Sequence, residues 1–175
     1  MEGPGFIQVY TGNGKGKTTA SLGMALRAAG HGFRTIMIQF MKGKIDYGEL
    51  KVQKMLEPYL EIVQSGGPHF IKKGGASEED IRMAQQGIDR AQQAFLGAQY
   101  DIVILDELNV AIDFGLIPLD QAIGLIRQKP ANVELIITGR YARQEILDMA
   151  DLVTEMKEIK HYYQKGVPAR NGIEK

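Results

Sequence analysis

Thr11-Gly-Asn-Gly-Lys-Gly-Lys-Thr-Thr19 is a glycine-rich loop that follows one apolar run, 6–10, and opens a helical pattern at 17–29. Glycines let backbone N–H groups turn inward around phosphate oxygens, and the N-terminus of the following helix adds a partial positive charge. The order strand, Gly-Lys-Thr, helix is typical of a P-loop, in which Lys17 reaches the phosphates and the Thr18 hydroxyl binds Mg²⁺. A threonine replaces the motif's usual first glycine, and three further glycines offset that loss. The loop therefore predicts a nucleotide phosphate site, the alternative being a glycine-rich turn that binds nothing.

Short apolar runs rich in β-branched residues alternate along the chain with helical patterns. Several runs are apolar throughout, which favours strands that are covered on both faces of a parallel sheet. Strands that alternate with helices indicate an α/β fold, with a mostly parallel sheet flanked by helices. The expected strands are 6–10, 35–39, 60–63, 102–105, 135–138 and a shorter run at 152–154, and the expected helices are 17–29, 77–96, 118–128 and 142–149.

Residues just after the expected strands are candidates for the site, because ligands of such sheets bind at the carboxyl ends of the strands. The run 102–105 ends in Asp106 and Glu107, which describes a Walker B strand whose acids can hold Mg²⁺ opposite the threonine hydroxyl of the loop. The spacing does not decide which acid binds the metal, and solvated acids at a strand end are the alternative. Arg140 follows the run 135–138, and its guanidinium suits phosphate oxygens, unless it is a plain surface arginine.

Two further loops have a place in the chain that fits ligand contact. Gln39-Phe-Met-Lys-Gly43 follows the second strand, although its residue types alone are weak evidence. Gly66-Gly-Pro-His-Phe70, with Lys72-Lys-Gly-Gly75 after it, is interpreted as a lid or as the wall of a second substrate site, or else as a plain surface loop. The residues alone thus indicate an α/β protein that binds a magnesium nucleotide, with ATP as the default, and they leave the acceptor open.

The composition excludes several classes of function. The chain has 175 residues, which predicts one domain, 1–175, and it has no cysteine, which excludes disulfides, thiolate zinc sites, iron–sulfur clusters and cysteine nucleophiles. Basic and acidic residues number 21 each, and without a basic excess we do not expect nucleic-acid binding. No signal-peptide pattern and no apolar run near ~18 residues is found, so we expect a cytoplasmic protein that does not enter a membrane. The mildly basic tail from Lys157 is interpreted as a solvated terminus.

The ordered set of motifs resembles the ATP:corrinoid adenosyltransferase family of the CobA/BtuR type, from about Ile7 to Glu174. The loop 11–19 is that family's own variant of the P-loop, threonine included. A P-loop alone is unspecific, whereas the ordered set is specific. The other shared features are Gly30-His-Gly32, Gln39-Phe40 with Lys42-Gly43, Leu105-Asp-Glu-Leu108, Ile137-Thr-Gly-Arg140, Asp148, Ala150-Asp151 and the tail Lys160-His161…Gly166…Ala169…Gly172-Ile173.

The resemblance implies transfer of the 5′-deoxyadenosyl group of ATP to cob(I)alamin or cob(I)yrinic acid a,c-diamide, with release of triphosphate. It also implies a RecA-like P-loop NTPase fold, a homodimer, ATP that lies reversed in the P-loop, and a flavoprotein or flavodoxin-type reductant. Carried over by position, Thr18 and Glu107 bind the metal, Mg²⁺ or Mn²⁺. The catalytic residues would be Lys17, Glu107 and Arg140; the nucleotide-binding residues Gly12, Asn13, Gly14, Lys15, Gly16, Lys17, Thr18 and Thr19; and the corrinoid contact Phe70.

This chemistry fits the residues, because the nucleophile is Co(I) itself and the protein needs no serine, cysteine or general base. The protein's tasks are to hold C5′ in line with the cobalt and to stabilise charge on the departing triphosphate. The alternative enzyme is a P-loop ATPase or small-molecule kinase that cleaves the terminal phosphoryl bond and releases ADP. A third hypothesis is a non-enzymatic ATP-binding subunit or corrinoid carrier, which would bind its ligand without turnover.

Overall fold

In the computed structural model, which describes residues 3–43, 47–69 and 71–174, six strands form one sheet in the order β3-β2-β4-β5-β1-β6. All neighbouring strands are parallel, so the sheet is parallel throughout and not merely for the most part. The expected α/β class is confirmed. The strands are β1 (Ile7–Thr11), β2 (Thr35–Phe40), β3 (Leu60–Ser65), β4 (Ile102–Asp106), β5 (Glu134–Thr138) and β6 (Leu152–Glu155).

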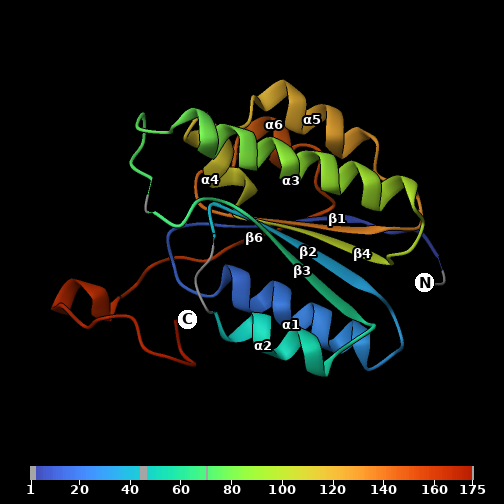
Figure 1. The fold of residues 1–175 in the computed structure, drawn as a ribbon, viewed down its shortest axis with the longest axis horizontal. Coiled ribbons are helices and arrows are strands. Elements are labelled where there is room, and N and C mark those ends of the chain that lie inside the picture. Colours follow the sequence, from blue (N-terminus) through green and yellow to red (C-terminus); the bar gives the residue numbers. More distant parts are fainter. Residues whose placement is uncertain (1–2, 44–46, 70, 175) are drawn as a thin grey trace.

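Helices cover both faces of the sheet (Figure 1). Two helices lie on one face, α1 (Lys17–Ala29) and α2 (Gly48–Met55). The other face is covered by α3 (Glu78–Leu96), α4 (Leu108–Asp113), α5 (Leu119–Arg127) and α6 (Gln144–Leu147). A short 3₁₀ helix, η1 (Tyr162–Lys165), belongs to the C-terminal segment, which leaves β6 and returns toward the start of α1. None of the helices in the described part of the chain is long and apolar enough to cross a membrane.

The helix boundaries follow local signals where such signals exist. The predicted helix 77–96 is confirmed, with Ser77 as its N-cap: the Asp80 N–H donates to the Ser77 hydroxyl at 3.2 Å, and the Ser77 N–H donates to the Asp80 carboxylate at 2.9 Å. The predicted helix 142–149 is too long, since α6 has four residues. The sequence patterns did not predict α2, α4 or η1.

The apolar core has two parts, one on each face of the sheet. Alternation along β2 divides its side chains between them: Ile36, Ile38 and Phe40 pack into the larger cluster toward α3 and α5, while Met37 packs into the smaller cluster toward α1. Every residue of β2 is buried. This double burial explains why the run is apolar nearly throughout, and it fixes the strand ends that carry the site.

Helix α3 crosses β2 and β3 at Gly87. A Cβ at this position would lie 2.7 Å from Cε1 of the buried Phe40 ring and 2.9 Å from Cβ of Ser65. Neither atom is the free end of a flexible side chain, so the crossing requires glycine.

Gly87→Ala is expected to lower the free energy of unfolding by about 1 kcal/mol, because overpacking costs about 1–3 kcal/mol and outweighs the gain in helix propensity. Gly124→Ala in α5 is the matched control, since a Cβ there meets no atom within 4 Å. This control is expected to raise stability by about 0.5–1 kcal/mol. Urea denaturation measures both changes, and a stabilised Gly87→Ala variant would contradict the close crossing.

Candidate P-loop nucleotide site

Lys17 turns back into its own loop at the start of α1. Its ammonium donates hydrogen bonds to the carbonyl oxygens of Gly12 and Gly14, both at 2.7 Å, and the side chain is buried. Burial lowers the pKa of Lys17, and the Glu107 carboxylate opposes that shift. Gly16, with a φ of 122°, turns the chain directly into the helix. The loop thus presents an amine at the positive end of a helix, where phosphate oxygens bind favourably.

The segment after β6 lies against the P-loop and explains two of its glycines. The Gly14 N–H donates to the Met156 carbonyl at 2.7 Å, and the Met156 N–H donates to the Thr11 carbonyl at 2.8 Å. A Cβ at Gly12 would lie 2.5 Å from the Met156 carbonyl oxygen, and one at Gly14 would lie 2.7 Å from it. These glycines are therefore required by the packing of two backbone segments, whatever they contribute to phosphate binding.

Asp106, at the end of β4, is fully buried and accepts hydrogen bonds from three sides. The hydroxyls of Thr18 and Thr138 donate to its Oδ1 at 2.8 and 2.7 Å. The Lys42 ammonium donates to its Oδ2 at 2.9 Å. Because Lys42 follows β2 and Thr138 ends β5, this carboxylate joins the two neighbours of β4 to the first turn of α1.

Glu107 adopts a left-handed backbone conformation, with a φ of 62°, at the N-cap of α4. A non-glycine residue rarely adopts this conformation, and such strain is found preferentially at functional sites. Its N–H donates to the Thr138 hydroxyl at 2.9 Å, so the same threonine orients both acids. Burial raises the pKa of Glu107, the Asp106 carboxylate adds to the increase, and Lys42 opposes it. The turn directs the second acid into the cavity, apart from the first.

Lys42 has a larger structural role than its sequence context indicated. Burial disfavours its charge, but the Asp106 carboxylate and its hydrogen bond, with a contribution from Glu49 at 3.7 Å, raise the pKa of Lys42. The sequence signals for Lys42 were its position just after a strand and its place, as Lys42-Gly43, among the motifs shared with the family. Thr138 was visible as the last residue of the expected strand 135–138 and as part of Ile137-Thr-Gly-Arg140, but nothing in the sequence indicated that it holds Asp106 and Glu107 in place.

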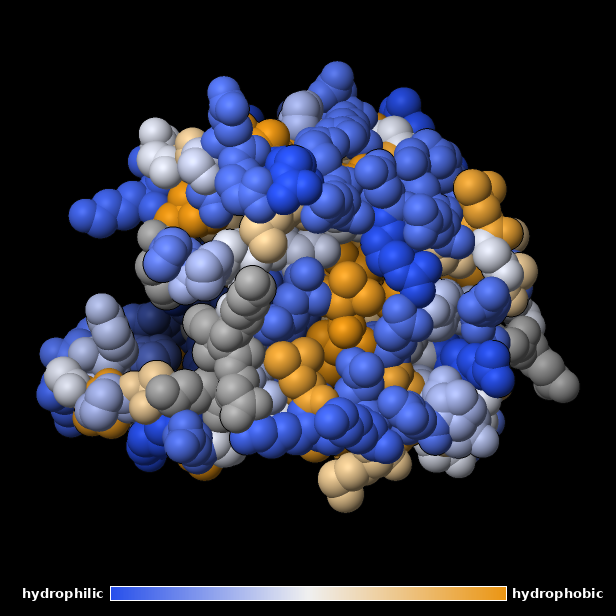
Figure 2. Space-filling view, in the orientation of Figure 1, coloured by the Kyte–Doolittle hydropathy of each residue, from blue (hydrophilic) through white to orange (hydrophobic). Residues whose placement is uncertain are grey.

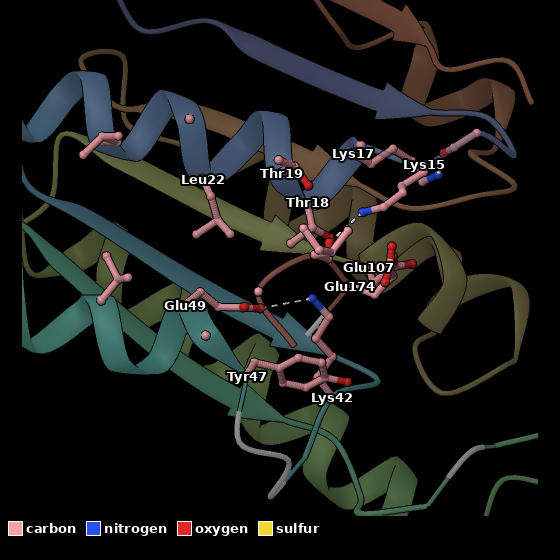
Figure 3. Close-up of a pocket in the computed structure, with 18 of the residues that line it drawn as sticks. Lys15, Lys17, Thr18, Thr19, Leu22, Lys42, Tyr47, Glu49, Glu107 and Glu174 are labelled. Atoms are coloured by element: carbon pink, nitrogen blue, oxygen red, sulfur yellow. Dashed lines mark hydrogen bonds and ion pairs between the residues drawn. The ribbon is translucent and has the colours of Figure 1, made fainter. Parts of the chain in front are cut away.

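A cavity of about 740 Å³ opens at this edge of the sheet, between α1 and α2 (Figure 3). Figure 3 shows Lys17 and Thr18 on the α1 side, with Lys42 and Glu49 on the opposite side. The part of the cavity away from the P-loop is apolar, so the cavity has one charged end and one apolar end. The apolar end is lined by Leu22, Leu26, Val52, Leu56 and Leu60.

Most of the predicted site residues line this cavity together. They are Gly14, Lys15, Gly16, Lys17, Thr18, Thr19, Glu107 and Arg140. Gly12 takes part through its carbonyl bond to Lys17, whereas Asn13 is not among the lining residues. Phe70 lies outside the described residues. The tail from Lys157 is largely exposed, as expected for a solvated terminus, but Gly172, Ile173 and Glu174 at its end also line the cavity, which the sequence did not indicate.

The oxygen atoms at the charged end fit Mg²⁺ or Mn²⁺. The Thr18 hydroxyl donates its hydrogen bond to Asp106, so the lone pairs of the Thr18 oxygen are available to a cation. The Glu107 carboxylate lines the same cavity. Hard cations of this kind prefer oxygen, and Mg²⁺ typically takes one or two protein oxygens together with substrate phosphates.

The P-loop, the acid pair at the end of β4 and the arginine after β5 define a P-loop nucleotide-binding protein of the α/β class. Residues 4–174 match the family ATP:corrinoid adenosyltransferase BtuR/CobO/CobP, and the chain belongs to this family. The reaction is therefore transfer of the adenosyl group of ATP to the cobalt of a corrinoid. The resemblance stated from the motifs is confirmed.

Similar proteins cover nearly the whole chain. The corrinoid adenosyltransferase of Escherichia coli (strain K12) is 36% identical over 170 residues, which are 97% of this chain and 85% of the relative. Corrinoid adenosyltransferase CobA of Salmonella typhimurium (strain LT2) is 36% identical over 174 residues, with 99% and 87% covered. The flagellar accessory protein FlaH of Methanocaldococcus jannaschii superposes with a TM-score of 0.58 at 11% identity, covering 87% of this chain and 71% of FlaH, and supports the RecA-like fold alone.

The Lys42–Asp106 ion pair is expected to couple two strand ends energetically. In a double-mutant cycle of Lys42→Met and Asp106→Asn, we expect a coupling of about 0.5–3 kcal/mol in the free energy of unfolding, because either single change leaves a buried group without its partner. The exposed Arg82–Glu79 pair in α3 is the control, where solvent screening should leave little coupling. Additive effects at Lys42 and Asp106 would contradict the role of this carboxylate.

Proposed function

We propose that the cavity holds ATP with its triphosphate on the P-loop and presents C5′ of the ribose to the Co(I) of a reduced corrinoid. The C5′–O bond breaks, the electron pair of Co(I) forms the Co–C bond, and triphosphate leaves with the electrons of the broken bond. The observation that carries this proposal is the convergence of Lys17, Thr18, Glu107 and Arg140 at the charged end of one cavity. The volume is typical of a small-molecule site.

The basic residues are proposed to stabilise the leaving group. Charge develops on the triphosphate as the C5′–O bond breaks, and fixed donors aimed at that charge lower the barrier. Lys17 would exchange the carbonyls of Gly12 and Gly14 for phosphate oxygens, which are better acceptors for an ammonium. Arg140 would bind from the carboxyl end of β5, the strand next to β1 at the same edge of the sheet. Because the cobalt supplies the nucleophilic electron pair, positioning and charge stabilisation are the protein's tasks.

Thr18 and Glu107 are proposed to hold Mg²⁺ or Mn²⁺. The metal would neutralise charge on the triphosphate oxygens when bound. Asp106 would act as a positioning residue, because its carboxylate accepts the Thr18 hydrogen and fixes the direction of the hydroxyl oxygen. Thr138 would hold the backbone of Glu107 in its left-handed conformation.

The loop 66–75 is proposed to shelter the corrinoid. Its backbone packs directly on the segment that carries Lys42, because a Cβ at Gly43 would collide with the Gly66 carbonyl. A second hollow, of about 420 Å³, is lined by residues of this loop and of α3, among them Pro68, His69 and Ile71. We also propose that Phe70 contacts the corrinoid. The protein would act as a homodimer in the cytoplasm, and a flavoprotein or flavodoxin-type partner would supply the electrons that reduce the cobalt.

Lys17→Ala is expected to weaken MgATP binding by roughly 100-fold or more, because the loop loses the ammonium that lies closest to the expected phosphate position. Calorimetric titration with MgATP measures the change. Lys54→Ala, an exposed lysine of α2, is the matched control and should bind MgATP as the wild type does. ATP affinity equal to the wild type in Lys17→Ala would rule out this phosphate site.

Glu107→Gln is expected to raise the Mg²⁺ or Mn²⁺ concentration for half-maximal turnover by roughly 10- to 100-fold, since a ligating carboxylate becomes neutral. Binding of the corrinoid alone, followed by its visible spectrum, should change little. Glu78→Gln at the exposed start of α3 controls for the loss of one negative charge. If corrinoid affinity fell while the metal dependence stayed intact, Glu107 would belong to the corrinoid site instead.

A further inference from the structure

The C-terminal segment 161–174 returns to the P-loop and closes one side of the cavity. The Lys15 ammonium donates a hydrogen bond to the Ile173 carbonyl at 2.9 Å, across 158 positions of the chain. His161 and Glu174 line the cavity together with the residues of the P-loop. Figure 1 shows this segment at the lower left, beside the carboxyl edge of the sheet, and Figure 2 shows a hollow between it and the rest of the molecule.

The segment has an internal structure of its own, centred on Glu174. The Glu174 carboxylate accepts the Tyr162 hydroxyl hydrogen and two bonds from the Arg170 guanidinium, at 3.1 and 3.2 Å. The Arg170 N–H donates to the same carboxylate at 2.9 Å, and the guanidinium lies 4.9 Å from the centre of the Tyr162 ring. These three residues, Tyr162, Arg170 and Glu174, form what we name the tail clasp.

The tail clasp resolves an electrostatic problem at an anion site. An isolated carboxylate on the wall of a triphosphate cavity would repel its ligand. Here Glu174 is neutralised by Arg170, and hydrogen bonds from Arg170 and Tyr162 lower the pKa of Glu174 to about 2. The negative charge of Glu174 on the cavity wall is therefore balanced by Arg170. The neighbouring Ile173 carbonyl is directed to Lys15.

Lys15 links the tail to the phosphate region. An ammonium has three hydrogens to donate, and the Ile173 carbonyl takes one of them. The others remain available to phosphate oxygens at the loop. One lysine can thus hold the tail and the ligand at the same time, so that each favours the position of the other.

We propose that residues 161–174 form a binding wall of the nucleotide site, that the tail clasp holds this wall in place, and that Lys15 couples it to the triphosphate of ATP. This inference rests on the proposed function, since it takes ATP as the occupant of the cavity. Tyr162, Arg170 and Glu174 are positioning residues, which act through the Ile173 carbonyl and the cavity wall. The segment increases the affinity for ATP and does not take part in the chemical step.

The test is Arg170→Ala in the full chain, with Arg170→Lys as the conservative variant and Arg127→Ala as the matched control. Arg170→Ala is expected to raise the Kd and the KM for MgATP by roughly 5- to 20-fold, as expected for lost charge-assisted contacts, and to leave kcat at saturating ATP within about twofold. Arg170→Lys should restore part of the affinity, and Arg127→Ala, which removes an exposed arginine at the end of α5, should match the wild type. An unchanged urea midpoint shows that the fold is intact.

A second readout follows the segment directly. Trypsin cleavage after Lys160 and Lys165 should be slowed in the wild type by MgATP and by inorganic triphosphate, but not by adenosine, because the coupling runs through Lys15. The inference is overturned if Arg170→Ala binds MgATP as the wild type does, or if it binds more tightly, which would make the tail a competitor. If the wild type itself does not bind MgATP, the proposed function fails instead.

Discussion

Three elements of the site depend on the buried carboxylate of Asp106. It accepts the hydroxyl hydrogens of Thr18 and Thr138 and pairs with Lys42, so α1, β5 and the end of β2 are held at fixed distances from β4. A buried charge is costly unless it is paired and hydrogen-bonded, and these partners supply both conditions. The left-handed turn that directs Glu107 into the cavity relies on the same threonine. The geometry of the charged end of the cavity thus follows from the hydrogen bonds and the ion pair that the buried Asp106 carboxylate requires.

The sequence predicted the sheet well because its strands are buried on both faces. Runs such as 102–105 are apolar throughout and have no other stable place in a small α/β protein. Helix α2 was missed because none of its residues is buried, so it has no strong apolar face, and α4 was missed because six residues after the acid pair give too short a period to detect. In 142–149 the apolar spacing continued beyond the ends of the helix that forms.

The sequence predicted the site residues whose role follows from their own side chain and their place after a strand or the glycine loop. It did not predict those whose role depends on a backbone group or on a partner distant in the chain. Lys17, Thr18, Glu107 and Arg140 follow strand ends or the glycine loop, and they meet as expected. Lys42 required the pairing of β2 with β4, in which Gln39 lies beside Asp106. The docked tail depends on the Ile173 carbonyl, which any residue would supply, so its composition indicated only a solvated end. The role of Phe70 stays a prediction.

Under the proposed function, the P-loop holds the leaving group of the reaction and not a phosphoryl donor. The direct measurement is an anaerobic incubation of the protein with MgATP and chemically reduced cobalamin, followed by the visible spectrum and by ³¹P NMR of the products. Adenosyl transfer should give light-sensitive adenosylcobalamin together with one intact triphosphate for each Co–C bond formed. ADP and phosphate without a Co–C bond would contradict it, and the cavity would then belong to an ATPase or a kinase.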